Sequence, residues 1–425
     1  MDLLRGPGSI SFRSPSSALT SSKRFPLSES DARALYLLRS LVFEDQDLRG
    51  SLSDIAQADA FVERLVAIAQ ANAVELRRED LIHFFKDDPL GLSRFAQLPA
   101  NHPSRPQPGW LPIRVFCQGD HLGADWAFFG RKRLSEPFFE DSIRQVLNRP
   151  FNKMFRFRLP LSEVPRWADA LPSVRPSGFI FHASRCGSTL AAQMLGALPQ
   201  NIVVSEAGPI DAAVQLGHAG GLDAGLLRAM VMLFGQRRTD SEARYFVKLD
   251  SWHSCALALF RQAFPSVPWV FLYREPHEIL ASQARQRGAQ MTPELFSPSF
   301  YGLEFPPGVP GPDYHARVLA RVCDAVLAEL PKGNGRLINY RQLPQALSSE
   351  ILAHFGVTPS ADDLGAMTAR ARFSAKVPQL QYASDSDAGR PEAMDAARAA
   401  ADLHVGEIYR RLEARRLASA MAGGR

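Results

Sequence analysis

Cysteine is scarce in this chain, and this scarcity excludes several protein classes. Only four of the 425 residues are cysteine, and none forms a C-x-x-C pair. Such spacing argues against a disulfide-stapled secreted scaffold and against a cysteine-ligated metal cluster. We therefore expect free thiols in a reducing, cytoplasmic compartment. The four positions are Cys117, Cys186, Cys255 and Cys323.

Long apolar runs and a strong excess of charge are also missing. No stretch approaches the roughly 18 consecutive apolar residues that a membrane span requires. The Ser-, Arg- and Pro-rich N-terminal segment has no apolar core, so we do not expect a secretory signal. The formal net charge of +5 is too small to indicate nucleic-acid binding, although it mildly favours anionic ligands.

What is present indicates a globular protein of several segments. The hydrophobic content of 46% and the charged content of 22% are ordinary for such proteins. Composition and periodicity predict a disordered leader (1–29), a small all-α domain (30–88), a Pro-rich linker (89–109), an α+β connector of unknown role (110–172), an α/β domain (173–416) and a frayed tail (417–425).

The predicted all-α domain carries a recognisable pattern. Residues 43–81 read FEDQDLRGSLSDIAQADAFVERLVAIAQANAVELRREDL, with apolar residues at helical spacing. An acidic turn, an apolar helix and a closing helix introduced by acids follow one another. This order resembles the Nif-type leader domain, which precedes modified peptides and also occurs on enzymes. A plain helical bundle without a ligand is the alternative.

In the α/β segment, short apolar runs alternate with helical patterns. Strands are predicted at 179–183, 202–205, 245–249, 269–273 and 336–339, and helices at 188–198, 222–236, 253–264, 276–288 and 314–330. Near-continuous apolar strands separated by helices predict a doubly wound parallel sheet. Ligands of such sheets bind at the carboxyl ends of the strands.

The stretch from Gly178 to Leu195, GFIFHASRCGSTLAAQML, is the most informative one. It predicts a strand, a loop of small residues and the start of a helix, which is the layout of an anion-binding cradle. Gly187 permits close backbone approach, Ser188 and Thr189 add hydroxyl groups, and Arg185 adds a guanidinium group. The loop lacks the lysine and the first glycine of a Walker A motif.

Charged residues follow three further predicted strands. Glu206 comes after IVVS, Lys248 and Asp250 end YFVKLD, and Arg274 ends WVFLY. Ser282 lies eight residues after Arg274, in the helix that Pro276 begins. A cation and a hydroxyl group placed in this way could bind a second phosphate.

Two anion sites on one such sheet are what an adenosine 3′,5′-bisphosphate group requires, and the chain here resembles the sulfotransferase superfamily. FIFHASRCGSTLAAQML is similar to its 5′-phosphosulfate loop, and WVFLYREPHEILAS is similar to its 3′-phosphate motif. INYRQL at 338–343 is similar to a later segment, except that Arg341 and Gln342 replace acids. The resemblance covers residues 176–415.

The resemblance implies 3′-phosphoadenylyl sulfate as donor, no metal, and a hydroxyl-bearing small molecule or peptide as acceptor. The donor's 5′ side would be held by Arg185, Cys186, Gly187, Ser188 and Thr189, and its 3′-phosphate by Arg274 and Ser282. Glu206 is the candidate base, and Arg185 and Lys248 would stabilise charge.

Several roles stay open at this point. His182 and His253 are alternative bases, although His182 could only orient the loop, and His253 is better explained as a capping or core residue. Lys248 could instead be a surface lysine, and Glu206 a salt-bridge partner. Lys376 and Arg390 could close a late basic loop over the nucleotide or belong to a solvated loop.

Two other functions remain as alternatives. The first is a P-loop kinase in which Asp250 binds Mg²⁺, and the second is an inactive nucleotide-binding scaffold that recruits a partner through its N-terminal helices. The acceptor and the oligomeric state cannot be derived from the sequence.

Overall fold

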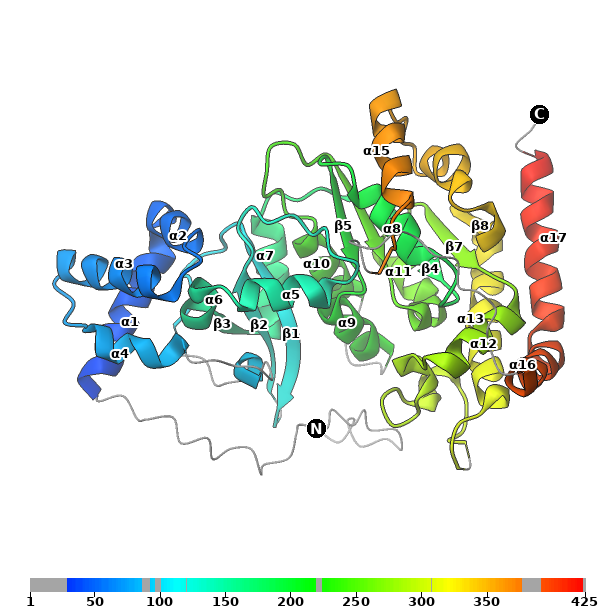
Figure 1. The fold of residues 1–425 in the computed structure, drawn as a ribbon, viewed down its shortest axis with the longest axis horizontal. Helices are drawn as coiled ribbons and strands as arrows, with labels where there is room; N and C mark the ends of the chain where they lie inside the picture. Colours follow the sequence, from blue (N-terminus) through cyan, green and yellow to red (C-terminus); the bar gives the residue numbers. More distant parts are fainter. Residues whose placement is uncertain are drawn as a thin grey trace.

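A computed structural model describes residues 29–85, 92–95, 101–119, 121–218, 224–306, 308–376 and 391–422. The predicted disordered leader therefore lies outside the described residues, apart from Glu29. Figure 1 shows an elongated molecule, with the N-terminal helices at one end, the larger sheet towards the middle, and the last helix at the other end.

The elements of secondary structure follow one another in three groups. The N-terminal group consists of α1 (Glu29–Glu44), α2 (Gln46–Ser53), α3 (Ala58–Ala71) and α4 (Arg78–Ile82). The second group consists of β1 (Trp110–Gln118), β2 (His121–Phe128), α5 (Phe139–Leu147), α6 (Pro150–Phe155), β3 (Phe157–Pro160) and α7 (Val164–Ala170).

The third group is the longest. Its strands are β4 (Pro176–His182), β5 (Asn201–Ser205), β6 (Arg244–Lys248), β7 (Trp269–Tyr273) and β8 (Gly335–Asn339). Its helices are α8 (Ser188–Gly196), α9 (Gly208–His218), α10 (Ala224–Phe234), α11 (Leu257–Ala263), α12 (Pro276–Arg285), α13 (Pro312–Glu329), α14 (Leu352–His354), α15 (Ala361–Ala371), α16 (Pro391–His404) and α17 (Gly406–Ala422).

The five strands of the third group form one parallel sheet in the order β5-β6-β4-β7-β8. All five predicted strands are confirmed, and the doubly wound α/β class is confirmed with them. β4 is central and pairs with β6 on one side and β7 on the other. The carboxyl ends of these three strands therefore meet at one edge of the sheet.

Side chains that alternate along the strands build a core on each face of the sheet. Ile180, Phe246 and Val270 pack with α8 and with residues of α15 on one face. Phe179, Val247 and Phe271 face the other cluster, which includes residues of α11 and α13. Both faces of the sheet are covered, which explains why the strands read as continuous apolar runs.

The predicted connector is an antiparallel sheet in the order β1-β2-β3, flanked by helices. This sheet and its helices agree with the α+β character predicted for the connector. Asp125 is fully buried in this sheet, where Arg114 and Arg158 donate to its carboxylate at 2.5 and 2.8 Å. Asp125 is therefore a structural ion-pair partner.

The N-terminal helices pack directly on this smaller sheet. Phe43 of α1 makes edge contacts with the rings of Trp110, Phe155 and Phe157. Arg39 is fully buried and donates to the carbonyl groups of Met154 and Arg156. The predicted helices at this end are confirmed, whereas the Nif-type assignment and the domain boundaries stay predictions.

Several helices differ from the expectations from sequence, and α15 and α16 are among those that were not predicted. α9 was not predicted, because its sequence GPIDAAVQLGH begins with turn residues and its buried side chains surround much of the helix. α17 continues to Ala422, beyond Arg416 where fraying was expected, because Leu and Ala in this stretch favour helix. Among the described residues, we find no helix with the length and apolar character needed to cross a membrane.

Candidate functional site

The loop between β4 and α8 has the backbone geometry of an anion cradle. Ser184, Arg185 and Gly187 have φ angles of 63°, 50° and 81°, so the chain turns sharply before α8. Gly187 is the N-cap residue and no side chain caps the helix, so the first N–H groups of α8 are left for a ligand. Consecutive N–H groups in such a turn bind anions.

Side chains from α12 and from the segment after it hold this loop. The Ser184 hydroxyl accepts hydrogen bonds from Gln283 at 3.1 Å and Gln290 at 3.2 Å. Arg185 donates to the Gln286 carbonyl at 2.6 Å. The loop that follows β4 is thus fixed by the helix that follows β7.

Cys186 differs from its neighbours because its side chain points away from the loop. The thiol is fully buried and donates to the Leu272 carbonyl at 3.0 Å. Burial raises the pKa of Cys186 to about 12, so the thiol stays neutral. Of the groups of Cys186, only the backbone N–H could donate a hydrogen bond to a bound anion.

A second cationic group lies at the carboxyl end of β7. The Arg274 guanidinium lies 4.6 Å from the centre of the Tyr340 ring and forms an ion pair with Glu278 one turn along α12. Ser282, on the same helix, is buried against the same pocket. Tyr340 belongs to the INYRQL segment, so three predicted motifs meet here.

Glu206 and Lys248 form a buried ion pair beside the loop. Glu206 follows β5 with a φ of 52°, and its backbone N–H donates to the Lys248 carbonyl at 2.8 Å. Burial alone would raise the pKa of Glu206, but the Lys248 ammonium group and His182 outweigh it and lower this pKa to about 2. Lys248 is 1% exposed, so it is not a surface lysine.

His182 connects this ion pair to the loop. Its Nδ1 accepts the Ser184 N–H at 3.0 Å, which leaves the proton on Nε2, and Nε2 lies 2.8 Å from the Leu249 carbonyl. The Glu206 carboxylate is 3.4 Å from the same Nε2. Burial lowers the pKa of His182, so the ring is neutral and orients the loop.

His253 and two acids form a hydrogen-bond network next to Glu206. Asp211 accepts from Trp252 at 2.6 Å, from His253 at 2.9 Å and from Gln215 at 2.5 Å. The Nδ1 atom of His253 accepts the Asp250 N–H at 3.3 Å, which agrees with the predicted capping role. This network fixes Trp252 at the wall of the pocket.

The same residues are the nearest approach to a metal site in the described part of the chain. Ligand atoms of Asp211, Asp250 and His253 lie within 4.8 Å of one another. However, Asp211 already accepts three hydrogen bonds, and the Nε2 proton of His253 points at it. Burial, Glu206 and Asp211 raise the pKa of Asp250 well above its usual range, which disfavours the ionised form that Mg²⁺ requires.

The loop, Glu206, Trp252 and Arg274 line one pocket of about 560 Å³. Predicted residues on its wall are Arg185, Cys186, Gly187, Ser188, Thr189, Glu206, Arg274, Ser282 and Lys376. Lys248 lies behind Glu206, and Arg390 lies outside the described residues. Residues that the sequence did not single out are Trp252, Gln286, Arg287 and Gln290; their positions depend on tertiary contacts that no local motif encodes.

The comparisons with known proteins found solved structures that are similar to this chain. No family model and no curated protein matches the chain. Sulfotransferase STF1 from Mycobacterium tuberculosis is 17% identical, with a TM-score of 0.33, over 52% of this chain and 80% of its own.

Two further solved structures show similarly low identity to this chain. The sulfotransferase domain of the Synechococcus PCC 7002 olefin synthase is 16% identical, with a TM-score of 0.30, over 54% of this chain and 87% of its own. Mouse sulfotransferase SULT7A1, solved with PAP, is 10% identical, with a TM-score of 0.33, over 59% of this chain and 93% of its own. All three TM-scores are below 0.5, so the function is argued below from the pocket itself.

Proposed function

We propose that this chain is a sulfotransferase that moves a sulfuryl group from 3′-phosphoadenylyl sulfate to a hydroxyl acceptor. The observation that carries the proposal is the presence of two anion-binding arrangements in one pocket. The first is the strained loop and the uncapped N-terminus of α8, and the second is Arg274, just before α12, with Ser282 in α12. A 3′,5′-bisphosphate needs both.

The residues present fit such a donor. Arg185, Ser188, Thr189 and the backbone N–H groups of 186–189 would bind the 5′-phosphosulfate, because helix N-termini and guanidinium groups favour anions. Arg274 and Ser282 would bind the 3′-phosphate, and Tyr340 holds the Arg274 guanidinium in place. The donor supplies the sulfuryl group, and positioning and charge stabilisation by these residues are then sufficient for in-line transfer.

Glu206 would take the proton of the acceptor hydroxyl, because its carboxylate lines the pocket. Its pKa is low because of Lys248, and an ionised carboxylate so strongly paired is a weak base. An anionic donor in the pocket that Glu206 lines would oppose its negative charge and raise the pKa of the carboxyl despite the Lys248 ion pair. Donor binding would thus increase the basicity of Glu206.

Phe138, Trp252 and Asp250 also line the pocket, and we assign them to its acceptor side. The aromatic faces favour a hydroxyl carried on a ring or another flat apolar group. Small molecules and peptides with such a group are the acceptors to screen.

Calorimetric binding of adenosine 3′,5′-bisphosphate tests the proposal. We expect metal-independent binding, weakened by about 10- to 100-fold in Arg274→Ala, because a charge-assisted hydrogen bond is lost. Arg285→Ala is the matched control, since Arg285 is an exposed arginine of α12, the helix that follows Arg274, and does not line the pocket.

ATP with Mg²⁺ and 5′-AMP complete the experiment. Tighter binding of ATP with Mg²⁺ would favour the kinase alternative, and an absence of binding would refute the proposal. Binding of the bisphosphate without turnover on any acceptor, in a protein with intact Glu206, would favour the scaffold alternative.

A further inference from the structure

A second pocket lies on the small antiparallel sheet, away from the site described above. It has a volume of about 1000 Å³ and shares no lining residue with the first pocket. Its walls come from β1, β2, β3, the turn before α7, and the first residues of α10. Pockets of this size, with apolar walls and a few polar groups, are typical of small-molecule sites.

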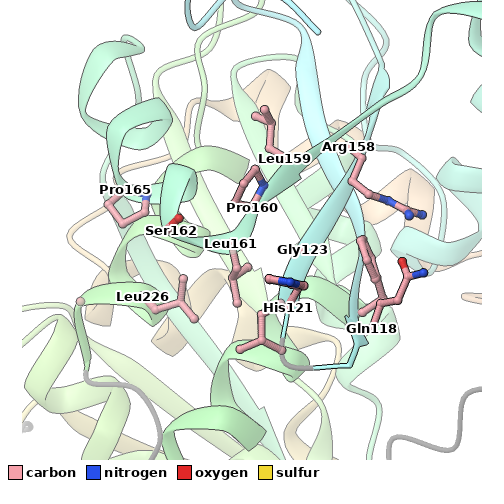
Figure 2. A pocket seen from close by; sticks show the side chains of 13 residues that line it. Gln118, His121, Gly123, Arg158, Leu159, Pro160, Leu161, Ser162, Pro165 and Leu226 are labelled. Carbon is pink, nitrogen blue, oxygen red and sulfur yellow. The ribbon is translucent and has the colours of Figure 1, made fainter. Parts of the chain in front are cut away.

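The Arg158 and Gln118 side chains lie apart from the apolar end of this pocket, although the Ser162 hydroxyl lies beside Leu161 and Pro165, and His121 lies between the two sides. In Figure 2 the Arg158 guanidinium and the Gln118 amide lie on one side, whereas Leu161, Pro165 and Leu226 lie on the other. A ligand that fills the pocket therefore needs an apolar body and one polar end.

The charge at the polar end is positive. Among the described residues, Arg114 and Arg158 share the carboxylate of the fully buried Asp125, and one carboxylate cannot neutralise two guanidinium groups. Arg158 uses its Nε–H for this pair, and its two terminal nitrogens make no further hydrogen bond within the described part of the chain. These donors lie at the pocket, where they can bind an anion.

The position of Arg158 is fixed by stacking. Its guanidinium lies 3.9 Å from the centre of the Phe116 ring, and the Arg114 guanidinium lies 5.2 Å from the same centre. Phe116 in turn lies on the backbone of Gly123, where an added Cβ would be 2.5 Å from the ring. The cation is therefore held in place at the pocket wall before any ligand arrives.

We propose that this pocket binds a small anionic amphiphile, with its carboxylate on Arg158 and its alkyl chain between Leu161 and Leu226. The inference does not depend on the sulfotransferase assignment, because neither the residues nor the test involves the first pocket.

Fluorescence titration of the full chain with 11-(dansylamino)undecanoic acid, with dodecanoate as competitor, tests this proposal. We expect saturable binding below the micellar concentration, displacement by dodecanoate, and at least tenfold weaker displacement by dodecanol. Arg158→Gln should weaken dodecanoate binding about tenfold or more and leave dodecanol unchanged, because only the charged end is affected. Leu226→Trp should weaken both, because the indole fills the apolar end.

Arg166→Gln is the matched control, because Arg166 lies on α7 and pairs with exposed Glu163 without lining the pocket. The melting temperature of each variant shows that it is folded. Equal displacement by dodecanoate and dodecanol, an unchanged affinity in both Arg158→Gln and Leu226→Trp, or loss of the probe on addition of adenosine 3′,5′-bisphosphate would overturn the proposal.

Discussion

Backbone strain in this protein is concentrated at the proposed nucleotide pocket. Of the five non-glycine residues with a positive φ in the described part of the chain, three line it: Ser184, Arg185 and Glu206. Such a conformation costs of order 1–3 kcal/mol at each residue and persists only where surrounding contacts enforce it. Here the enforcing contacts are those of Gln283, Gln290 and Lys248.

The Glu206 ion pair predicts a specific dependence of stability on pH. The pKa of Glu206 falls from 4.5 to about 2 on folding, so folding is favoured above pH 4.5, where the carboxylate is ionised in both states. This contribution is lost as the pH falls from about 4.5 to 2. We expect the free energy of unfolding of the wild type to fall more steeply in this range than that of Glu206→Gln, as measured by urea denaturation.

At pH 7, Glu206→Gln should be less stable by about 1.5–3 kcal/mol, because buried Lys248 loses its charged partner. Glu163→Gln is the control, since Glu163 pairs with exposed Arg166. Parallel pH profiles for wild type and Glu206→Gln would show that the ion pair does not form in solution.

Cysteine reactivity follows from burial. Burial raises the pKa of Cys186 and Cys255 to about 12 and that of Cys323 still further, and thiolates are the reactive form. Cys117 and Cys255 are both only partly buried, but the raised pKa of Cys255 slows its reaction. Cys117 should therefore react first with Ellman's reagent in the native protein, and Cys117→Ser should remove this fast phase. A fast phase that survives in Cys117→Ser would contradict the described burial.

At the scale of elements, the sequence predicts what local patterns encode. β4 to β8 were predicted because strands buried on both faces form continuous apolar runs, and the helix after Gly187 because small residues precede an apolar pattern. The orientation of Cys186 and the network of Asp211, Trp252 and His253 were not predicted. These features depend on contacts across 41 or more residues, which no local pattern carries.

The start of α8 gives a prediction for a single glycine. At Gly187 the φ is 81°, and an added Cβ would lie 2.8 Å from a Leu343 methyl group and 2.9 Å from the Tyr340 ring. Gly187→Ala should therefore displace Tyr340, and with it the contact that holds Arg274. We expect at least tenfold weaker calorimetric binding of adenosine 3′,5′-bisphosphate, together with a lower melting temperature.

The Gly356→Ala variant separates the effect of backbone strain from the effect of steric crowding. Its φ is 67°, and nothing lies within 4 Å of an added Cβ. It should lower stability by about 1–2 kcal/mol, the cost of a left-handed non-glycine residue, with no effect on nucleotide affinity. Equal nucleotide affinities in both variants would mean that Gly187 does not shape the site.

At the scale of the whole molecule, the N-terminal helices and the small sheet share one core. Phe43, Trp110 and Phe157 pack together across the junction between them. Removal of residues 1–100 would expose these rings, so a truncated chain would test folding as well as recruitment. A point variant at the junction is therefore the sharper probe of how the two parts depend on each other.

Arg39 is the residue for that probe. Its guanidinium is buried and donates to the carbonyl groups of Met154, Arg156 and Asn101, so Arg39→Ala leaves buried acceptors unpaired on both sides. Each such acceptor costs about 1–3 kcal/mol. We expect a lower melting temperature and faster amide hydrogen exchange in α1 and in β3 alike, because the two elements depend on the same contacts.

Arg64→Ala is the control, since Arg64 is exposed on α3 and should leave exchange unchanged in both elements. If Arg39→Ala accelerates exchange in α1 while β3 keeps its protection, the N-terminal helices open separately and the shared core does not couple them. If hydrogen exchange accelerates in both elements while adenosine 3′,5′-bisphosphate still binds with its original affinity, the coupling does not extend beyond the small sheet. The structure of the nucleotide site would then depend on the parallel-sheet part alone, as the local contacts around its loop indicate.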